Sequence, residues 1–195
     1  MIHMKSNTIL ATVFFSLVAL ISFAFWAFGS AWNLSEVSTY TLCAAVFFGS
    51  GGLALSPASG ARGMRGLLAF SARFSIGFLI YAIVWSVSWF AFRNTFGEVL
   101  GSFVGLTALV AVLRSGRSKT PDLLTATAVV SLWYTLGYYL GGQSYEALQN
   151  RGALAIDLPW ERATVVTVAR FSWGLFYGLG LGFGLARMLQ ASRPN

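Results

Sequence analysis

The sequence predicts an all-α membrane protein with six transmembrane helices, and three observations support this fold class. Hydrophobic residues make up 56% of the 195-residue chain and charged residues only 10%, with a mean hydropathy of +0.70. These values lie outside the range of ordinary soluble domains. Six apolar segments follow one another, each close to the roughly 20 residues that a helix needs to cross a bilayer. A six-residue string also occurs twice. We therefore interpret residues 1–195 as a single integral membrane domain.

The first expected helix covers residues 9–28, which contain no charged residue. A secretory signal peptide is the alternative, although its apolar core is usually shorter, about 7 to 15 residues. Asn33 and Glu36 have the spacing of a capping box, which starts the second helix near residue 34. This helix runs to about residue 55 through a glycine-rich stretch, 49–52. That stretch either packs closely against another helix or breaks the helix beside a cavity.

The third expected helix covers residues 67–92 and is long enough that it must tilt or protrude from the membrane. Thr95 and Glu98 form a second capping box, which opens the fourth helix. Gly101 and Gly105 in that helix make a GxxxG pair, the pattern of a close helix contact.

The fifth expected helix begins after Thr120, Pro121 and Asp122, which supply a cap, a first-turn proline and a first-turn acid. It runs to about residue 142, with an aromatic end typical of the headgroup boundary. An Asp-Leu-Pro sequence at 157–159 predicts the start of the sixth helix, which ends near residue 189.

The basic residues predict the orientation of the six helices. Cytoplasmic loops of membrane proteins carry an excess of Lys and Arg. Eight such residues fall on one predicted side and three on the other, so we expect both termini to be cytoplasmic. The first group contains Lys5, Arg62, Arg65, Arg114, Arg117, Lys119, Arg187 and Arg193, and the second contains Arg93, Arg151 and Arg162.

The repeated string indicates an internal duplication. Residues 72–77 read ARFSIG and residues 169–174 read ARFSWG, so five of six positions match. A unit of three helices used twice must enter the membrane upside down the second time. We therefore expect an inverted repeat of three plus three helices, with repeat 1 at about 5–92 and repeat 2 at about 93–189.

The two copies are followed by ridges of opposite character on their helices. At steps of four residues, Arg73 is followed by Gly77, Tyr81, Trp85 and Trp89, and Arg170 by Gly174, Gly178 and Gly182. We expect the third and sixth helices to cross antiparallel, with the aromatic ridge in the glycine groove and Arg170 beside Trp85 and Trp89. In the simpler alternative, the glycines only pack and the two tryptophans form an outer aromatic belt.

Arg73 and Arg170 are the candidate functional residues, because charge at membrane depth is costly and often marks a pathway. Together with Ser75, Ser172, Tyr81, Trp85 and Trp89, they are candidates for lining the pathway of an anion or for binding a lipid headgroup. The alternative is that both arginines only anchor their helices by extending towards lipid phosphates.

The residues that are missing exclude several kinds of chemistry. No Asp or Glu lies inside an expected span, which argues against carboxylate-based proton or sodium coupling. His3 is the only histidine and Cys43 the only cysteine, so histidine metal sites, thiolate cages and haem ligation lack their ligands. We therefore expect no enzyme, no cofactor and no metal. The net charge of +7 is scattered between apolar segments, which argues against nucleic-acid binding.

Two functions remain open. The first is a small channel or uncoupled carrier for an anion or a small polar solute. The second is a non-transporting scaffold that packs against a larger membrane complex, or against a second copy of itself, through its glycine faces at Gly77, Gly101, Gly105, Gly174, Gly178 and Gly182. In both cases the chain resides in the lipid bilayer of a cell membrane, of the bacterial inner-membrane type, with an organellar membrane as the alternative.

Overall fold

A computed structural model describes residues 2–115, 122–151 and 154–192 of the chain, with side chains described from residue 6 onwards. This part folds into six α-helices, and all six are long and apolar enough to cross a membrane. Their bounds are α1 Ile2–Phe28, α2 Glu36–Ser59, α3 Gly63–Phe92, α4 Thr95–Arg114, α5 Leu123–Leu148 and α6 Arg162–Ala191.

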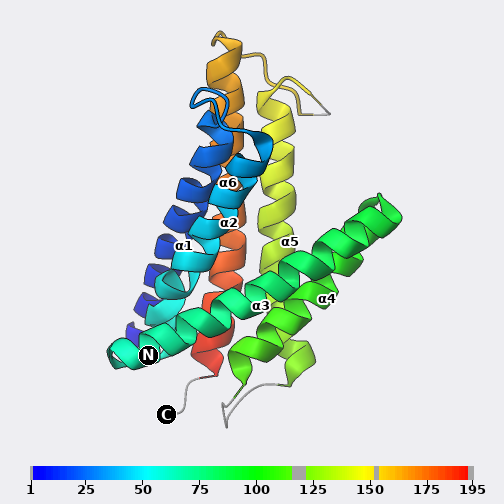
Figure 1. Ribbon diagram of the computed structural model, residues 1–195. Helices are drawn as coiled ribbons and strands as arrows, with labels where there is room; N and C mark the ends of the chain where they lie inside the picture. Colours follow the sequence, from blue (N-terminus) through cyan, green and yellow to red (C-terminus); the bar gives the residue numbers. More distant parts are fainter. Residues whose placement is uncertain (1, 116–121, 152–153, 193–195) are drawn as a thin grey trace.

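The helices pack in two groups (Figure 1). In the first group, α1 packs against α2 and α6, and α6 packs against α5. In the second, α3 and α4 form an antiparallel pair that rests on α2 through α3 and on α5 through α4. Figure 1 shows α3 crossing the bundle obliquely, so that the turn between α3 and α4 projects away from α1 and α2. This divergence leaves room for cavities on the inner side of the α3 and α4 pair.

The start of α2 differs from the prediction. Ser35 is its N-cap and accepts a hydrogen bond from the Ser38 amide at 3.1 Å, whereas Asn33 lies before the helix in the left-handed region with φ 53°. The helix continues past Pro57 to Ser59 and passes through its glycine run without a break. The broken-helix interpretation is therefore wrong.

The ends of the later helices also differ from the predictions. Asn94, not Thr95, caps α4, and its side chain accepts from the Gly97 amide at 3.0 Å. Asp122 caps α5, while the predicted contributions of Thr120 and Pro121 lie outside the described residues. α5 continues to Leu148, and α6 begins only at Arg162, because the Asp-Leu-Pro sequence remains in the preceding connection.

The glycine ridge of α6 faces α1, so the predicted crossing of α3 and α6 is wrong. A Cβ atom added to Gly174 would lie 2.7 Å from the Phe23 ring, and one added to Gly178 would lie 2.8 Å from Ser16 Cα. Gly182 faces Phe15 in the same way, at 3.1 Å. The glycines of α6 thus form a groove that receives α1, with phenylalanines at its two ends and the small residues Ser16 and Ala19 between them.

The aromatic ridge of α3, at Tyr81 and Trp85, packs against α4 and not against the predicted sixth helix. It faces the GxxxG pair of α4: an added Cβ would lie 3.0 Å from Trp85 Cα at Gly101 and 2.9 Å from the Tyr81 ring at Gly105. Gly77, on α3 itself, faces Leu109 of α4. Large side chains therefore pack against small ones, as predicted. The interfaces are those of α3 with α4 and of α6 with α1, instead of α3 with α6.

Candidate functional site

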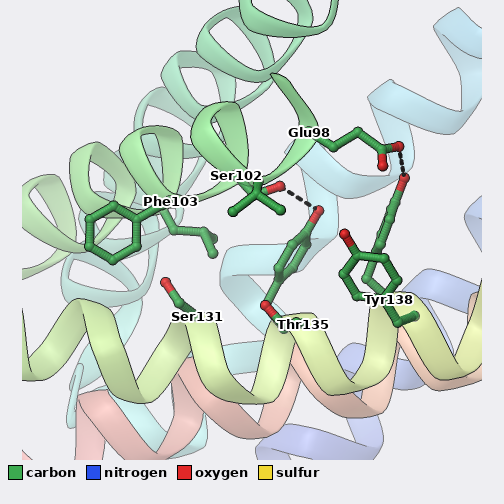
Figure 2. A pocket seen from close by; sticks show the side chains of 10 residues that line it. Glu98, Ser102, Phe103, Ser131, Thr135 and Tyr138 are labelled. Carbon is green, nitrogen blue, oxygen red and sulfur yellow. Dashed lines mark hydrogen bonds between the residues drawn. The ribbon is translucent and has the colours of Figure 1, made fainter. Parts of the chain in front are cut away.

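Two neighbouring cavities lie where the α3 and α4 pair diverges from the other helices. The first has a volume of about 110 Å³ and lies between α4 and α5 (Figure 2). The second has a volume of about 470 Å³ and is lined by residues of α1, α2, α3, α5 and α6. Tyr134 and Tyr138 of α5 line both cavities and form the wall between them.

A carboxylate lies in the smaller cavity. Glu98 is in the first turn of α4, and its Oε1 accepts a hydrogen bond of 3.0 Å from the Tyr138 hydroxyl of α5 (Figure 2). Within the described residues, Glu98 has no cationic partner. As expected, Glu98 lies at the start of the fourth helix, and the structure adds that its side chain lines a cavity.

Hydroxyl groups and apolar side chains line the rest of the smaller cavity; the apolar residues are Val99, Phe103 and Leu106. Ser102 Oγ donates to Tyr134 Oη at 3.3 Å, and Tyr81 Oη donates to the same atom at 2.9 Å. Ser131 Oγ is buried and has no hydrogen-bond partner among the described residues. A buried hydroxyl without a partner is costly, so this cavity is suited to a ligand or water that supplies the missing hydrogen bond.

Helical spacing brings these polar groups together. Glu98 and Ser102 are one turn apart on α4, and Ser131, Thr135 and Tyr138 follow one another along the facing side of α5. Figure 2 shows the two rows on opposite sides of the cavity. The result is a small cavity with one negative charge and several hydroxyl groups, a set of oxygen atoms that favours cations and hydrogen-bond donors.

The larger cavity is aromatic. Ten of its thirteen lining residues are Phe, Tyr or Trp, and the other three are Cys43, Ala82 and Ser86. None of the described residues that line it is Lys, Arg, Asp or Glu. Among the predicted pathway residues, Tyr81 and Trp85 line this cavity, whereas Trp89 stacks on Trp85 at a ring distance of 6.2 Å and lines neither cavity.

Arg73 lies outside both cavities. Its side chain is exposed, and Nη1 donates to the Ser115 carbonyl at the C-terminal end of α4, at 3.1 Å. Carbonyl groups at a helix C-terminus have no partner within the helix and carry partial negative charge. Arg73 thus ties α3 to the end of α4.

Arg170 makes the corresponding contact at the end of α1. Its Nη1 donates to the Trp26 carbonyl at 2.7 Å, and its guanidinium carbon lies 4.8 Å from the centre of the Trp26 ring. The cation–π contact expected for Arg170 is therefore present, but with Trp26 instead of Trp85 or Trp89. Arg170 is half-buried and, like Arg73, does not line either cavity.

The two repeated serines connect neighbouring helices. Ser75 Oγ on α3 donates to the Phe48 carbonyl of α2 at 2.7 Å. The Ser172 hydroxyl on α6 lies 3.0 Å from the Ser144 hydroxyl of α5. Both serines are engaged in packing and lie outside the two cavities.

The central residues of the site are not evident from the sequence. Glu98 has the spacing of a helix cap, and the aromatic end of the fifth helix, which contains Tyr134 and Tyr138, is typical of a headgroup boundary. The structure brings all three residues together at the α4 and α5 interface. The spacing of Glu98 with Ser102, and of Ser131 with Thr135, is a polar stripe in each helix that could have indicated this interface. Among the described residues, no group of three or more His, Cys, Asp or Glu side chains comes together to bind a metal ion.

Comparisons with protein-family models, curated proteins and solved structures find no match to this chain.

Proposed function

We propose that this chain is a small membrane transport protein, a channel or carrier, whose solute is a cation or an uncharged polar molecule that passes beside Glu98. One observation carries the proposal: Glu98 lies in the first turn of a helix that is apolar enough to span a membrane, lines a cavity, and has a tyrosine hydroxyl but no cation as its described partner. Carboxylates that face a cavity between transmembrane helices are typical of ion and substrate pathways.

The arginines give an anion pathway less support. Both donate to carbonyl groups at helix ends, and neither lines a cavity. Their contacts fit the anchoring role. Of the two solute classes expected from the sequence, an anion or a small polar solute, we therefore propose the small polar solute. We expect the protein to prefer a positively charged solute over a negatively charged one.

Contacts of the repeated string support an inverted three-plus-three repeat as the framework of this transporter. Arg73 joins α3 to the end of α4, and Arg170 joins α6 to the end of α1. Each arginine therefore links the third helix of one repeat to the first helix of the other. Ser75 links α3 to α2 and Ser172 links α6 to α5, so each serine links the third and second helices of one repeat. A pseudo-two-fold axis in the membrane plane would relate each of these contacts to its counterpart in the other repeat.

We place both termini on the cytoplasmic side of a bacterial-type inner membrane, on the basis of the Lys and Arg bias. Three of the residues counted, Arg117, Lys119 and Arg193, lie outside the described residues. The start of α1 and the end of α6 lie at the same end of the bundle (Figure 1), as an even number of crossings requires. The cavity residues Glu98 and Tyr138 then lie in the outer half of the membrane.

The glycine faces on which the scaffold alternative rests are occupied within the chain itself. The six glycines proposed as contacts with a partner all face neighbouring side chains or backbone of the same chain. A homo-oligomer or a larger complex would have to use other faces of the helices.

Uptake into proteoliposomes tests the transport proposal. We would measure labelled methylammonium, glycerol and chloride in parallel for the wild type, Glu98→Gln and, as a matched control, Glu146→Gln, which changes a carboxylate of α5 outside both cavities. We expect uptake of methylammonium or glycerol above that of empty liposomes, with methylammonium uptake about tenfold lower for Glu98→Gln only, since a hydrogen bond to a charged group contributes about 1.5 to 3 kcal/mol. Chloride uptake that is lost in Arg73→Met or Arg170→Met would favour the anion pathway. If all three solutes enter no faster than into empty liposomes, the transport proposal is wrong and the scaffold alternative stands.

A further inference from the structure

The aromatic cavity has no part in the proposed function as stated so far. It adjoins the cavity of Glu98 through Tyr134 and Tyr138. Its volume of about 470 Å³ lies within the range of small-molecule sites, roughly 300 to 1,000 Å³. We propose that this cavity binds an organic ammonium cation, which makes the substrate of the proposed transport function an alkylated amine.

Charge complementarity favours a cation over an anion here. The faces of Tyr and Trp rings carry negative potential and attract ammonium groups, and cages of such rings bind quaternary ammonium ligands. Among the side chains that the structure describes, no basic one lines the cavity. Arg170 lies over the Trp26 ring without lining the cavity, and its Nη1 donates to the Trp26 and Ala27 carbonyls at the end of α1.

Tyr138 connects the carboxylate to the aromatic wall. Its ring lines both cavities, and its hydroxyl donates to Glu98 Oε1 at 3.0 Å. A phenol that donates a hydrogen bond to a carboxylate is polarised, and its ring becomes more electron-rich. The negative charge of Glu98 therefore acts on the aromatic cavity through Tyr138, although the carboxylate itself lies in the smaller cavity.

A cation has a polar route onwards from the aromatic cavity. Tyr81 and Tyr134 are hydrogen-bonded to each other at 2.9 Å on the wall between the cavities, and Tyr134 also accepts from Ser102 on the far side of that wall. Rotation of these side chains would join the aromatic cavity to the hydroxyl groups and carboxylate of the smaller one.

Cys43 provides a direct probe of the site, because it is the only cysteine of the chain and lines the aromatic cavity. We would compare its rates of modification by two methanethiosulfonate reagents of similar size, one carrying a trimethylammonium group and one a sulfonate. Each forms a mixed disulfide with the thiol and releases methanesulfinate. The control is a Cys43→Ser, Ser38→Cys protein, whose thiol lies on the exposed face of α2 outside the cavity.

We expect the ratio of cationic to anionic rates to be about tenfold higher at Cys43 than in the control protein. Choline should protect Cys43 from N-ethylmaleimide, whereas its uncharged isostere 3,3-dimethylbutan-1-ol should not. Protection by choline should weaken in Glu98→Gln and persist in Glu146→Gln. Equal rate ratios at the two thiols, or equal protection by the two isosteres, would overturn the proposal.

The experiment separates the failure of this inference from the failure of the proposed function, on which it rests. Choline protection that depends on Glu98, without any methylammonium or glycerol uptake, supports the binding site and rejects transport. Uptake that depends on Glu98, with equal protection by choline and its isostere, supports transport and overturns the organic-cation site.

Discussion

The Tyr138 hydroxyl of α5 donates a 3.0 Å hydrogen bond to the Glu98 carboxylate of α4. This bond spans the interface between the α3 and α4 pair and the other helices, at the wall that separates the two cavities. Its two partners should therefore act as a unit in any function that uses the cavities.

Glu98→Gln and Tyr138→Phe should be strongly non-additive. Each single substitution removes the same charge-assisted hydrogen bond, so we expect the double variant to lose little more methylammonium uptake than either single one. A double-mutant cycle on uptake rates should give a coupling of about 1 to 2 kcal/mol, within the range of about 0.5 to 3 kcal/mol for contacting groups. Additive losses would show that the two side chains act separately.

Arg170→Met should destabilise the protein more than Arg73→Met. The Arg170 guanidinium is half-buried, bonds to the Trp26 carbonyl and packs over the Trp26 ring, whereas Arg73 is exposed. We expect a loss of about 2 to 4 kcal/mol for Arg170→Met and about 1 kcal/mol or less for Arg73→Met, measured by unfolding in detergent micelles. Equal losses of stability in the two variants would contradict the conclusion that burial makes Arg170 the more important of the two arginines.

Gly137→Ala and Gly180→Ala should each disrupt the contact of α5 with α6. A Cβ atom on Gly137 would lie 2.8 Å from Gly180 Cα, and one on Gly180 would lie 2.7 Å from Gly137 Cα. Since backbone cannot move aside as a side chain can, we expect each variant to lose roughly 1 to 3 kcal/mol of stability.

Gly142→Ala is the matched control within α5. Nothing lies within 4 Å of a Cβ at this position, so alanine should be neutral or should stabilise by up to about 1 kcal/mol through its helix propensity. Unfolding of the three variants in the same detergent checks the pair of predictions. A destabilised Gly142→Ala would contradict the open space at that position.

The N-cap of α5 should make a small, pH-dependent contribution to stability. The Thr125 hydroxyl, followed by the Thr125 amide, donates to Asp122 and lowers the pKa of this carboxyl below its ordinary value of 3.8. Because the folded-state pKa is depressed, the stabilisation is complete above about pH 5 and is lost as the pH falls through the folded-state pKa. The stability difference between the wild type and Asp122→Ala should therefore be constant from about pH 5 to 8 and shrink below pH 4. A difference that grows on acidification would contradict this.

The helix partners were predicted less well than the helices themselves. The sequence predicts that an aromatic ridge packs in a glycine groove, but the predicted partner of the ridge at Tyr81 and Trp85 is the sixth helix. The groove that receives it is Gly101 and Gly105 of α4, the next helix along the chain. Several grooves of similar shape existed, and a short connection between neighbouring helices favours the local one.

The contact of Glu98 with α5 could not be predicted, because its position in the sequence also fits a local role at the start of the helix. A glutamate three residues after threonine at a helix start is the pattern of a capping box. In the structure Asn94 caps α4, which leaves the Glu98 side chain free to reach Tyr138. Only the position of α4 relative to α5 distinguishes these two uses of the same residue.

The sequence by itself determined that the chain is helical, that six segments are long and apolar enough to span a membrane, and which positions are small enough for close contact. These are local properties, since backbone hydrogen bonds within each apolar segment must be satisfied by that segment. The tertiary structure alone decided which helices pair and where cavities remain. In a bilayer, hydrophobicity does not distinguish one helix partner from another, so the fit of side chains along whole helices makes that choice. That fit lets α3 and α4 diverge from the bundle, and it brings Glu98 to Tyr138 beside an aromatic cavity.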